Sequence, residues 1–235
     1  MKGIRSMIVF LMLMLTAAIA FGGEQITLQK AQGDVSVRAG VTETWMKAGA
    51  GDLLKPDATL KTGKHSSAVL LLHFANKKIS LPPEVMLDIS DIRELTQEEL
   101  MLKLTMEKVR ASSYEWKNKE LNMPNTTIVH GPDISKRSDT LSAGGSEVGV
   151  LQLNGTRVLY ENGFYSTSAL KTIEVLRRYP SLGLKFENRL LIAQALEKSN
   201  LKSEALNDYV ALSMSQSITK EQRELLQAKI AQLKK

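Results

Sequence analysis

The 235-residue sequence contains no cysteine, and this absence excludes three features at once. The chain forms no disulfide, so its stability must come from buried apolar cores alone. It has no thiol to act as a catalytic nucleophile. It also lacks the cysteine to which a lipid is attached near the N-terminus of bacterial lipoproteins. We therefore expect the mature chain to be soluble.

Histidine is scarce, and the common catalytic motifs are missing. The three histidines are His65, His73 and His130, which fall in a predicted turn, strand and loop. None of them has a second ligand at a metal-binding spacing. The sequence has no nucleophile elbow, no phosphate-binding loop and no zinc-protease motif. No metal and no cofactor are therefore expected.

The first 20 residues have the pattern of a secretory signal peptide. Lys2 and Arg5 precede an apolar run over residues 7–15, which continues into small residues that include Ala18 and Ala20. The run is shorter than the ~20 apolar residues that cross a bilayer, and small residues suit signal peptidase. We predict cleavage after Ala20 and export to the periplasm. An uncleaved N-terminal anchor is the alternative, and it exports the body of the chain as well.

The charge of the chain is modest and unevenly distributed. Residues 24–121 contain 14 basic and 14 acidic residues, whereas residues 122–235 contain 15 basic and 11 acidic ones. A bias of this size usually serves solubility. An anion-binding face for a cell-wall polymer, a lipid headgroup or an acidic partner is the alternative. Nucleic acid is not expected as the partner of an exported protein.

The pattern of residues 24–121 predicts a small all-β domain. Strand-forming residues alternate in period two over five segments, and turn residues separate them: residues 26–29, 35–37, 68–74, 78–81 and 85–89. Residues 91–121 are ambiguous, because residues 96–99 look like a helix capping box while apolar residues alternate at 100, 102, 104 and 106. The alternation favours a strand.

The pattern changes after residue 121. Proline, glycine and small polar residues gather over residues 122–146 and predict a linker. Helical periodicity then predicts a domain over residues 147–235 with five helices: residues 151–161, 166–178, 186–198, 202–213 and 219–234. The short breaks between them predict antiparallel hairpins. The expected fold class is α+β, a small all-β domain followed by an α-helical hairpin domain.

The β part resembles the FecR domain over about 65 residues. The residues that carry this resemblance are Gly33, Val35, Trp45, Gly51, Asp52, Thr62, Gly63 and Pro82. It implies a periplasmic β domain whose glycines serve turns, and Trp45 is expected to be a core anchor rather than a ligand platform. The iron-transport regulator that names the family has a cytoplasmic anti-sigma region. Only six residues precede the apolar run here, so we expect no direct role in transcription control.

The helical part resembles tetratricopeptide repeats. The residues that carry this resemblance are Gly155, Tyr160, Gly163, Tyr165, Ala169, Tyr179 and Pro180 in one unit, then Leu190, Ala193, Ala195, Ala205, Leu206 and Tyr209 in the next. Ala169 and Ala205 lie 36 residues apart, close to the ~34-residue repeat of such arrays. The resemblance implies a concave face that holds a peptide or a partner helix.

Four residues are candidates for a binding face, because aromatic and arginine side chains dominate interface energetics. They are Tyr160, Tyr165, Arg157 and Arg189. For the two tyrosines, packing inside the helical hairpins is the alternative interpretation.

Export, two binding-type folds and missing catalytic motifs favour a non-enzymatic periplasmic binding or scaffold protein. It would be an adaptor that contacts envelope proteins, or peptidoglycan. The alternative is a periplasmic sensor that relays the signal of an outer-membrane receptor without its own anti-sigma region. A third hypothesis is a peptidoglycan hydrolase that uses a carboxylate pair, either Glu98 with Glu99 or Asp88 with Asp91. Charged turns and solvated faces explain both pairs as well.

Overall fold

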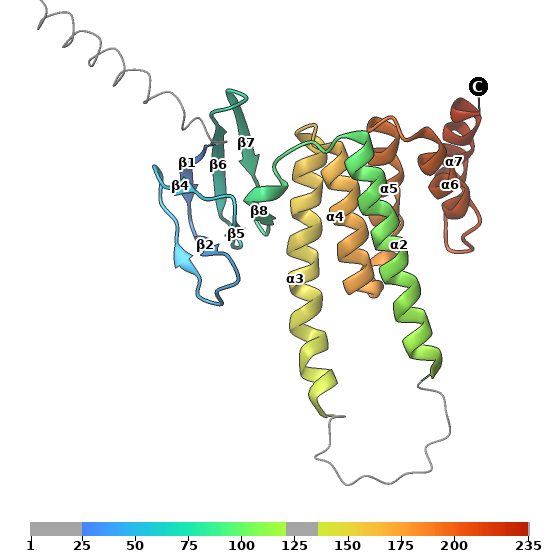
Figure 1. Ribbon diagram of the computed structural model, residues 1–235, viewed down its shortest axis with the longest axis horizontal. Helices are drawn as coiled ribbons and strands as arrows, with labels where there is room; N and C mark the ends of the chain where they lie inside the picture. The colour runs from blue at the N-terminus through green and yellow to red at the C-terminus, as the bar shows by residue number, and fades with distance from the viewer. Residues whose placement is uncertain (1–24, 121–135, 235) are drawn as a thin grey trace, which may run out of the picture.

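The computed structural model describes residues 25–120 and 136–234, with side chains over residues 25–112 and 146–234. A β-rich part comes first along the chain and a helical part follows, as Figure 1 shows. The predicted order of a β part and then a helical part is therefore confirmed. The predicted signal peptide, residues 1–20, lies outside the described residues.

The β-rich part consists of two four-stranded antiparallel sheets that share one core. The first sheet has the order β4-β1-β6-β7: β4 (Leu53–Leu54), β1 (Ile26–Gln32), β6 (Ser67–Leu72) and β7 (Lys77–Leu81). The second has the order β3-β2-β5-β8: β3 (Met46–Lys47), β2 (Val35–Ala39), β5 (Ala58–Thr62) and β8 (Met86–Asp88). Alternate side chains of a strand point to one face, so Ala68, Leu70 and Leu72 of β6 enter the core together. All five predicted strands are present, whereas β3, β4 and β5 were not predicted.

Several residues of the FecR-like pattern stabilise turns. Gly33 has a φ of +77°, and a Cβ there would lie 2.6 Å from Ser66 Oγ, so the position suits only glycine. Thr62 Oγ1 donates to the carbonyl of Pro82 (2.8 Å) and accepts from the amide of Val85 (3.0 Å). These contacts fix the turn between β7 and β8 against β5. The membership of a FecR family itself stays a prediction.

Trp45 does not anchor the core, contrary to the expectation from the sequence. The core between the sheets is filled by aliphatic side chains such as Leu28 and Leu60. The Trp45 ring is half-buried and lies beside two cations instead, with its centroid 5.0 Å from Arg38 Cζ and 4.6 Å from Lys61 Nζ. The ring therefore belongs to the outer face of the second sheet.

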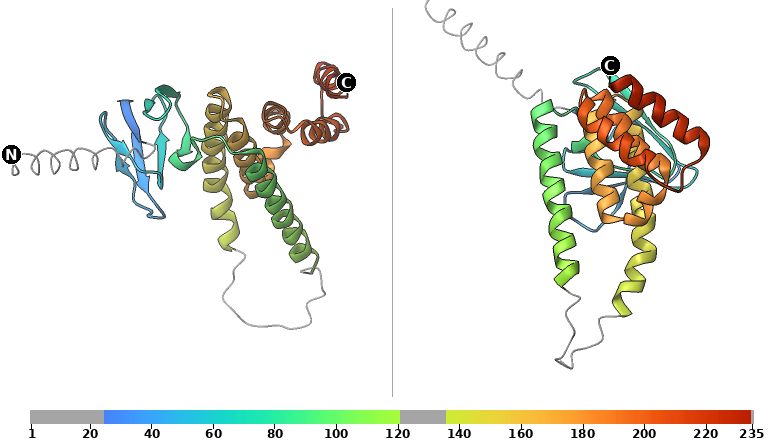
Figure 2. Two further views of the ribbon diagram at one scale, coloured as in Figure 1. Left: turned by 45° about the horizontal axis from the view of Figure 1, so that its top comes forward. Right: turned by 90° about the vertical axis from the view of Figure 1, so that its right-hand side faces the viewer.

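The helical part has six α-helices within the described residues. They are α2 (Gln97–Glu120), α3 (Lys136–Glu161), α4 (Tyr165–Arg178), α5 (Phe186–Lys198), α6 (Lys202–Ser213) and α7 (Lys220–Leu233), with the short 3-10 helices η2 (Ile89–Asp91) and η3 (Pro180–Leu184). From α3 onward each helix packs against the next, and α2 packs against α4 (Figure 2). The last four helices match their predicted ranges to within one residue at each end. Tetratricopeptide character, by contrast, stays a prediction.

The expected strand over residues 91–121 is wrong, because α2 occupies most of this range. Leu100 and Leu104 lie one turn apart and are buried, whereas Leu102 lies on the other side of the helix and is 64% exposed. The alternation therefore came from apolar residues on two faces of a helix. Thr96 caps α2 by accepting a hydrogen bond from the amide three residues later (3.2 Å), so the capping box was the correct signal. The β structure ends at β8.

Helix α3 begins at Lys136, inside the range predicted as a linker, and residues 121–135 lie outside the described residues. Its second half packs on the second sheet, because Val158 and Leu159 belong to the core of the two sheets. At Gly155 the helix approaches so closely that a Cβ would lie 2.2 Å from the carbonyl oxygen of Met86. The β-rich part and the helices therefore share packed surface at α3. Their division into separate domains stays a prediction.

Candidate functional site

Three of the four predicted binding residues lie in helix packing. Arg157 donates to Asn154 Oδ1 (2.7 Å) on α3 and to Asn188 Oδ1 (2.6 Å) at the start of α5. The rings of Tyr160 and Tyr165 meet edge to face with centroids 5.2 Å apart, and Tyr160 packs against the helical core. These contacts agree with the packing interpretation for both tyrosines and give Arg157 a role in joining α3 to α5.

Arg189, the fourth candidate, lines a groove between α2, α4, α5 and α6, which we call the helical groove. It encloses about 300 Å³. Its apolar lining comes from all four helices: Leu104, Ala111, Ile173, Ile192, Leu196 and Leu212. Its polar lining is Glu107, Lys108, Arg177, Arg189, Glu204, Asn207 and Asp208. An apolar hollow with a few convergent polar groups is the usual form of a ligand site.

Charges of both signs in the helical groove have no close partner within the described part of the chain. Burial raises the pKa of the Asp208 carboxyl, and the nearby cations Arg189 and Lys108 lower it only in part. Among the described residues, the side chains of these three make neither an ion pair nor a hydrogen bond. With Glu204, which likewise forms no ion pair with a described residue, the groove offers two carboxylates and two cations to an incoming group.

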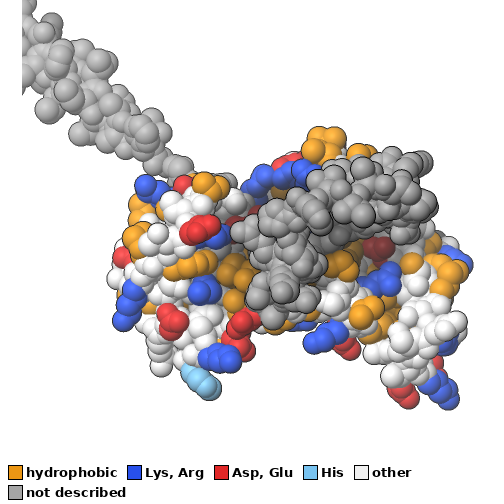
Figure 3. All heavy atoms as spheres, turned by 90° about the horizontal axis from the view of Figure 1, so that it is seen from below, with side chains coloured by type: hydrophobic (Ala, Val, Ile, Leu, Met, Phe, Trp, Pro, Cys, Tyr) orange, Lys and Arg blue, Asp and Glu red, His pale blue; other side chains and the backbone are white. Residues whose placement is uncertain are grey.

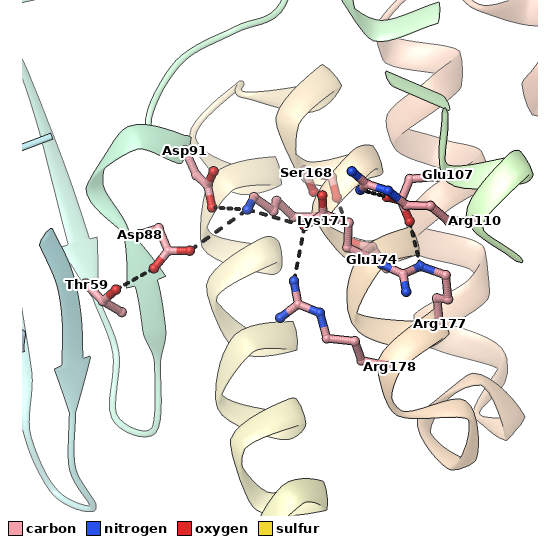
Figure 4. Close-up of polar contacts among 11 residues, drawn as sticks. Thr59, Asp88, Asp91, Glu107, Arg110, Ser168, Lys171, Glu174, Arg177 and Arg178 are labelled. Atoms are coloured by element: carbon pink, nitrogen blue, oxygen red, sulfur yellow. Dashed lines mark hydrogen bonds and ion pairs between the residues drawn. The ribbon is translucent and has the colours of Figure 1, made fainter. Parts of the chain in front are cut away.

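A second hollow, the polar cleft, lies between η2, α2 and α4 and encloses about 320 Å³. Lys171 of α4 gathers acidic side chains beside it, as Figure 4 shows. Its Nζ lies 3.2 Å from Asp91 Oδ2, 3.4 Å from Glu174 Oε2 and 3.9 Å from Asp88 Oδ2. Burial alone would lower the pKa of Lys171, but the three carboxylates raise it above its usual value. Lys171 is therefore an ammonium that joins the predicted pair Asp88 and Asp91 to α4.

The Lys171 network reaches from the second sheet into the helices. Thr59 Oγ1 on β5 donates to Asp88 Oδ1 (2.6 Å) on β8. At the other end, Arg178 Nη2 lies 3.7 Å from Glu174 Oε2 (Figure 4). Because its members come from β5, β8, η2 and α4, the network fixes the sheet relative to the helices.

Glu107 connects α2 to α4 at the boundary between the polar cleft and the helical groove, and it lines both. Its side chain is 3% exposed and binds Arg110 Nη1 through Oε1 (2.5 Å) and Arg177 Nε through Oε2 (2.8 Å). Burial would raise the pKa of Glu107, but hydrogen bonds from the two arginines outweigh it and hold the pKa below its usual value. Glu107 is thus a buried carboxylate that holds α2 against the helical array.

Three of the four carboxylates proposed for acid–base catalysis form ion pairs here, and the fourth, Glu98, is exposed. Asp88 and Asp91 bind Lys171, and Glu99 binds Arg93 (2.6 Å) and Lys103 (3.0 Å). Hydrogen bonds from these two cations lower the pKa of Glu99. Over the described residues, no group of three or more histidine, cysteine, aspartate or glutamate side chains is placed to hold a metal ion. The charged side chains at the polar cleft therefore hold structural elements together. We call the Lys171 network and the Glu107 ion pairs the clamp.

Asp91 makes the stability of the clamp depend on pH. Burial raises its pKa from 3.8 to about 6, with smaller contributions from Asp88 and Glu174 and an opposing one from Lys171. The folded chain therefore holds this proton more tightly than the unfolded chain, and the contribution of Asp91 to the free energy of unfolding falls as the pH rises from about 4 to about 6. Asp91→Asn is expected to remove this fall.

Chemical denaturation of wild type and Asp91→Asn across this pH range measures the effect. The stability of the wild type relative to the variant should decline between about pH 4 and about pH 6 and stay constant above about pH 7. Asp57→Asn, a change at an exposed carboxylate, is the control. An identical pH dependence of wild type and Asp91→Asn would show that Asp91 is not buried as described.

Sequence reasoning missed most of the groove and the cleft. Lys108 and Glu107 lie on a helix that was predicted as a strand, and Asp208 lies on a correctly predicted helix but far from them in sequence. No feature of the sequence indicated the role of Lys171, because two of its carboxylate partners lie on β8 and η2 and the third, Glu174, lies one turn further along α4. Three features of the sequence pointed to parts of this arrangement: the capping box before α2, the candidate Arg189, and the pair Asp88 and Asp91.

No protein-family model, curated protein or solved structure matches the chain. The FecR-like and tetratricopeptide-like interpretations therefore rest on the sequence patterns alone. In the ranges that the structure describes, no helix has the length and apolar character that crossing a membrane requires.

Proposed function

We propose that the chain is an exported, non-enzymatic binding protein of the periplasm that holds a polypeptide segment of an envelope protein in the helical groove. One observation carries this proposal: the apolar part of the hollow lies beside four charged side chains that form no ion pair with a described residue, namely Lys108, Arg189, Glu204 and Asp208. Lys108 and Arg189 are exposed and open to a partner, whereas burial of the half-buried Asp208 carboxylate is costly without one. A bound segment supplies both the apolar and the polar partners.

The lining of the helical groove defines the chemistry of the segment. A hollow of about 300 Å³ is at the lower end of ligand pockets, so it takes a few side chains of a chain segment rather than a whole domain. Apolar side chains fit between Ile173 and Leu212. Acidic groups fit Arg189 and Lys108, and a basic group fits Asp208. The exposed amide of Asn207 suits a backbone peptide group.

The clamp supports the same proposal because it fixes the walls of the groove. Glu107 holds α2 to α4 through Arg177, and the Lys171 network holds α4 to the second sheet. A site whose walls are fixed before binding loses less conformational entropy when the ligand arrives. The FecR-like and tetratricopeptide-like patterns and the predicted export agree with an adaptor in an envelope assembly. Sensing through an outer-membrane receptor is the alternative, in which the bound segment belongs to the receptor.

Site-specific photo-crosslinking in intact source cells tests the proposal. A benzoylphenylalanine at Asn207 lies in the groove, and the same residue at Gln227 lies exposed on α7 outside it. We expect one envelope protein to be crosslinked at Asn207 and not at Gln227. The crosslinked peptide, identified by mass spectrometry, should carry an apolar residue next to charged ones.

The outcomes separate the alternatives. A receptor domain crosslinked at Asn207 would favour the sensor over the structural adaptor. The same products at both positions, or none at Asn207, would contradict a polypeptide site in the groove. Release of soluble fragments from purified peptidoglycan by the purified protein would instead support the hydrolase hypothesis.

A further inference from the structure

The outer face of the second sheet carries a hollow that the helical groove does not include. It lies between β2, β5 and β8 on one side and residues 147–152 of α3 on the other, and it encloses about 450 Å³. A neighbouring hollow of about 530 Å³ continues it toward β3. Trp45 and Lys61 line both, so the two form one trough that passes the tryptophan. We call it the sheet trough.

Three cations line the sheet trough. Arg38, Lys47 and Lys61 project from three neighbouring strands, and none of them forms an ion pair with a described residue. Arg38 and Lys61 each lie beside the Trp45 ring, at 5.0 and 4.6 Å from its centroid, so both charges are placed at the tryptophan that the two hollows share. Two neighbouring cations in a hollow attract an anionic group.

Two buried polar atoms in the trough lack a partner. Arg38 Nε is a hydrogen-bond donor, Gln152 Oε1 on α3 is an acceptor, and both are buried without a hydrogen bond among the described residues. The one hydrogen bond that Arg38 makes there is long, from Nη2 to Thr59 Oγ1 at 3.4 Å. Buried polar groups are nearly always hydrogen-bonded, so the unpaired donor and the unpaired acceptor on residues of one hollow are available to an added hydrogen-bonding group.

We infer that the sheet trough binds a saccharide chain that carries carboxylates. The carboxylate pairs with Arg38 and Lys61, a sugar hydroxyl or amide donates to Gln152 Oε1, and the half-buried indole of Trp45 contacts the apolar face of a sugar ring. A bare inorganic anion lacks both the donor for Gln152 and the apolar face for Trp45.

The acidic residues of the trough agree with a sugar ligand. Glu147 lines the first hollow and Asp34 the second, and both are acceptors for sugar hydroxyls. A polyanion with a charge at every position would be repelled by them. Carboxylates spaced by neutral units would place one charge at the Arg38 and Lys61 pair and hydroxyls at the acidic ends.

Calorimetric titration with defined oligosaccharides tests the inference. The acidic probe is a hexasaccharide of alternating glucuronate and N-acetylglucosamine, and the neutral probe is a hexasaccharide of N-acetylglucosamine alone. We expect binding of the acidic probe, weakened by salt, and binding of the neutral probe that is at least tenfold weaker. With Trp116→Phe as background, the fluorescence of Trp45 should change during the acidic titration.

Matched variants locate the site. Arg38→Gln and Lys61→Gln should each weaken the acidic probe about tenfold or more, because each removes a charge-assisted contact. Lys55→Gln removes the same charge at an exposed position outside the trough and should have no effect. Thermal unfolding of each variant checks that the fold is retained, and Lys61→Gln serves if Arg38→Gln is unstable.

Three results would overturn the inference. They are equal binding of the two probes, an equal loss in Lys55→Gln, and competition by inorganic phosphate as strong as that by the acidic saccharide. Soluble peptidoglycan fragments, used as a second acidic probe, would identify the cell wall as a source if they bind with the same dependence on Arg38. None of these measurements involves the helical groove. A negative result for the sheet trough would therefore leave the proposed polypeptide site in the groove unaffected, and the reverse also holds.

Discussion

Gly155→Ala is expected to lower the free energy of unfolding by about 3 kcal/mol, the upper part of the range for overpacked cores. A Cβ at this position would lie 2.2 Å from the carbonyl oxygen of Met86 and 3.2 Å from its carbonyl carbon. Both are backbone atoms of β8, so no side chain can move aside. Helix propensity alone would predict the opposite, since alanine is favoured over glycine in a helix by about 1 kcal/mol.

Urea denaturation measures this effect, with Gly183→Ala as the matched control. A Cβ at Gly183 would meet only Leu176 Cδ1, at 4.0 Å, so the control should change the free energy of unfolding by less than about 0.5 kcal/mol. A Gly155→Ala variant as stable as the wild type would mean that α3 does not lie against β8. The clamp would then lack its support, because the same packing places α4 beside Asp88 and Asp91.

The structural role of Gly155 differs from the role that the tetratricopeptide-like pattern suggested. In the tetratricopeptide-like interpretation it is a small residue that lets two helices approach. In the structure it lets a helix approach a strand, and Val158 and Leu159 follow on the same side of α3 into the core of the sheets. A sequence pattern reports that a close approach is needed, but not which element approaches.

The helices α4 to α7 could be predicted because their local signals agree with one another. Thr219 begins α7 with a capping box, and Gly163 and Asn200 adopt positive φ at the breaks before α4 and α6. Each of these signals depends on neighbours within a few residues. Tertiary contacts did not overrule them, so the predicted ends hold to within one residue.

Helix α2 could not be predicted from its apolar pattern because its apolar residues lie on both its buried side and its exposed side. Leu100 and Leu104 are buried, but Leu102, Met106 and Met101 are exposed by 64%, 47% and 39%. A period-two pattern assumes that every apolar residue faces one core. Here some apolar side chains face solvent, so the alternation of apolar residues did not correspond to one buried face.

The candidate sites could be predicted only in part, for the same physical reason. Arg189 was identified because arginine is frequent at interfaces, and it lines the helical groove. Its neighbours Lys108 and Asp208 lie 81 and 19 residues away in sequence. The packing of α2 against α4 brings in Lys108, and the packing of α5 against α6 brings in Asp208. Trp45 was identified from its motif. The motif does not indicate whether its ring covers the inner or the outer face of the second sheet, so its outward position could not be predicted.

Basic and acidic side chains lie close together over much of the surface that Figure 3 shows, with hydrophobic side chains among them. On the described part of this face, the basic side chains are scattered rather than gathered into one patch. The solubility interpretation of the overall charge agrees with this arrangement. The proposed recognition sites are accordingly local clusters, the helical groove and the sheet trough.

The helical groove gives the second large expected effect, because it can be blocked without touching the core. Ala111 is exposed on α2 and lines the groove, and Arg189 is exposed on α5. Ala111→Trp fills the hollow, and Arg189→Glu reverses the charge of one wall. Each should weaken binding of the segment mapped by crosslinking at least tenfold, or about 1.4 kcal/mol.

Matched controls carry the same substitutions on helix surfaces outside the groove. Ala211→Trp adds the same indole to an exposed position of α6, and Lys202→Glu makes the same charge reversal at the start of that helix. Neither should change the affinity. All four variants should unfold at the same temperature as the wild type to within a few degrees.

Calorimetric titration of that segment into the wild type and these four variants tests the central claim most directly. The account predicts that Ala111→Trp and Arg189→Glu raise the dissociation constant at least tenfold while Ala211→Trp and Lys202→Glu leave it unchanged. Equal affinity of all five proteins would contradict the claim, because the segment would then bind elsewhere on the chain.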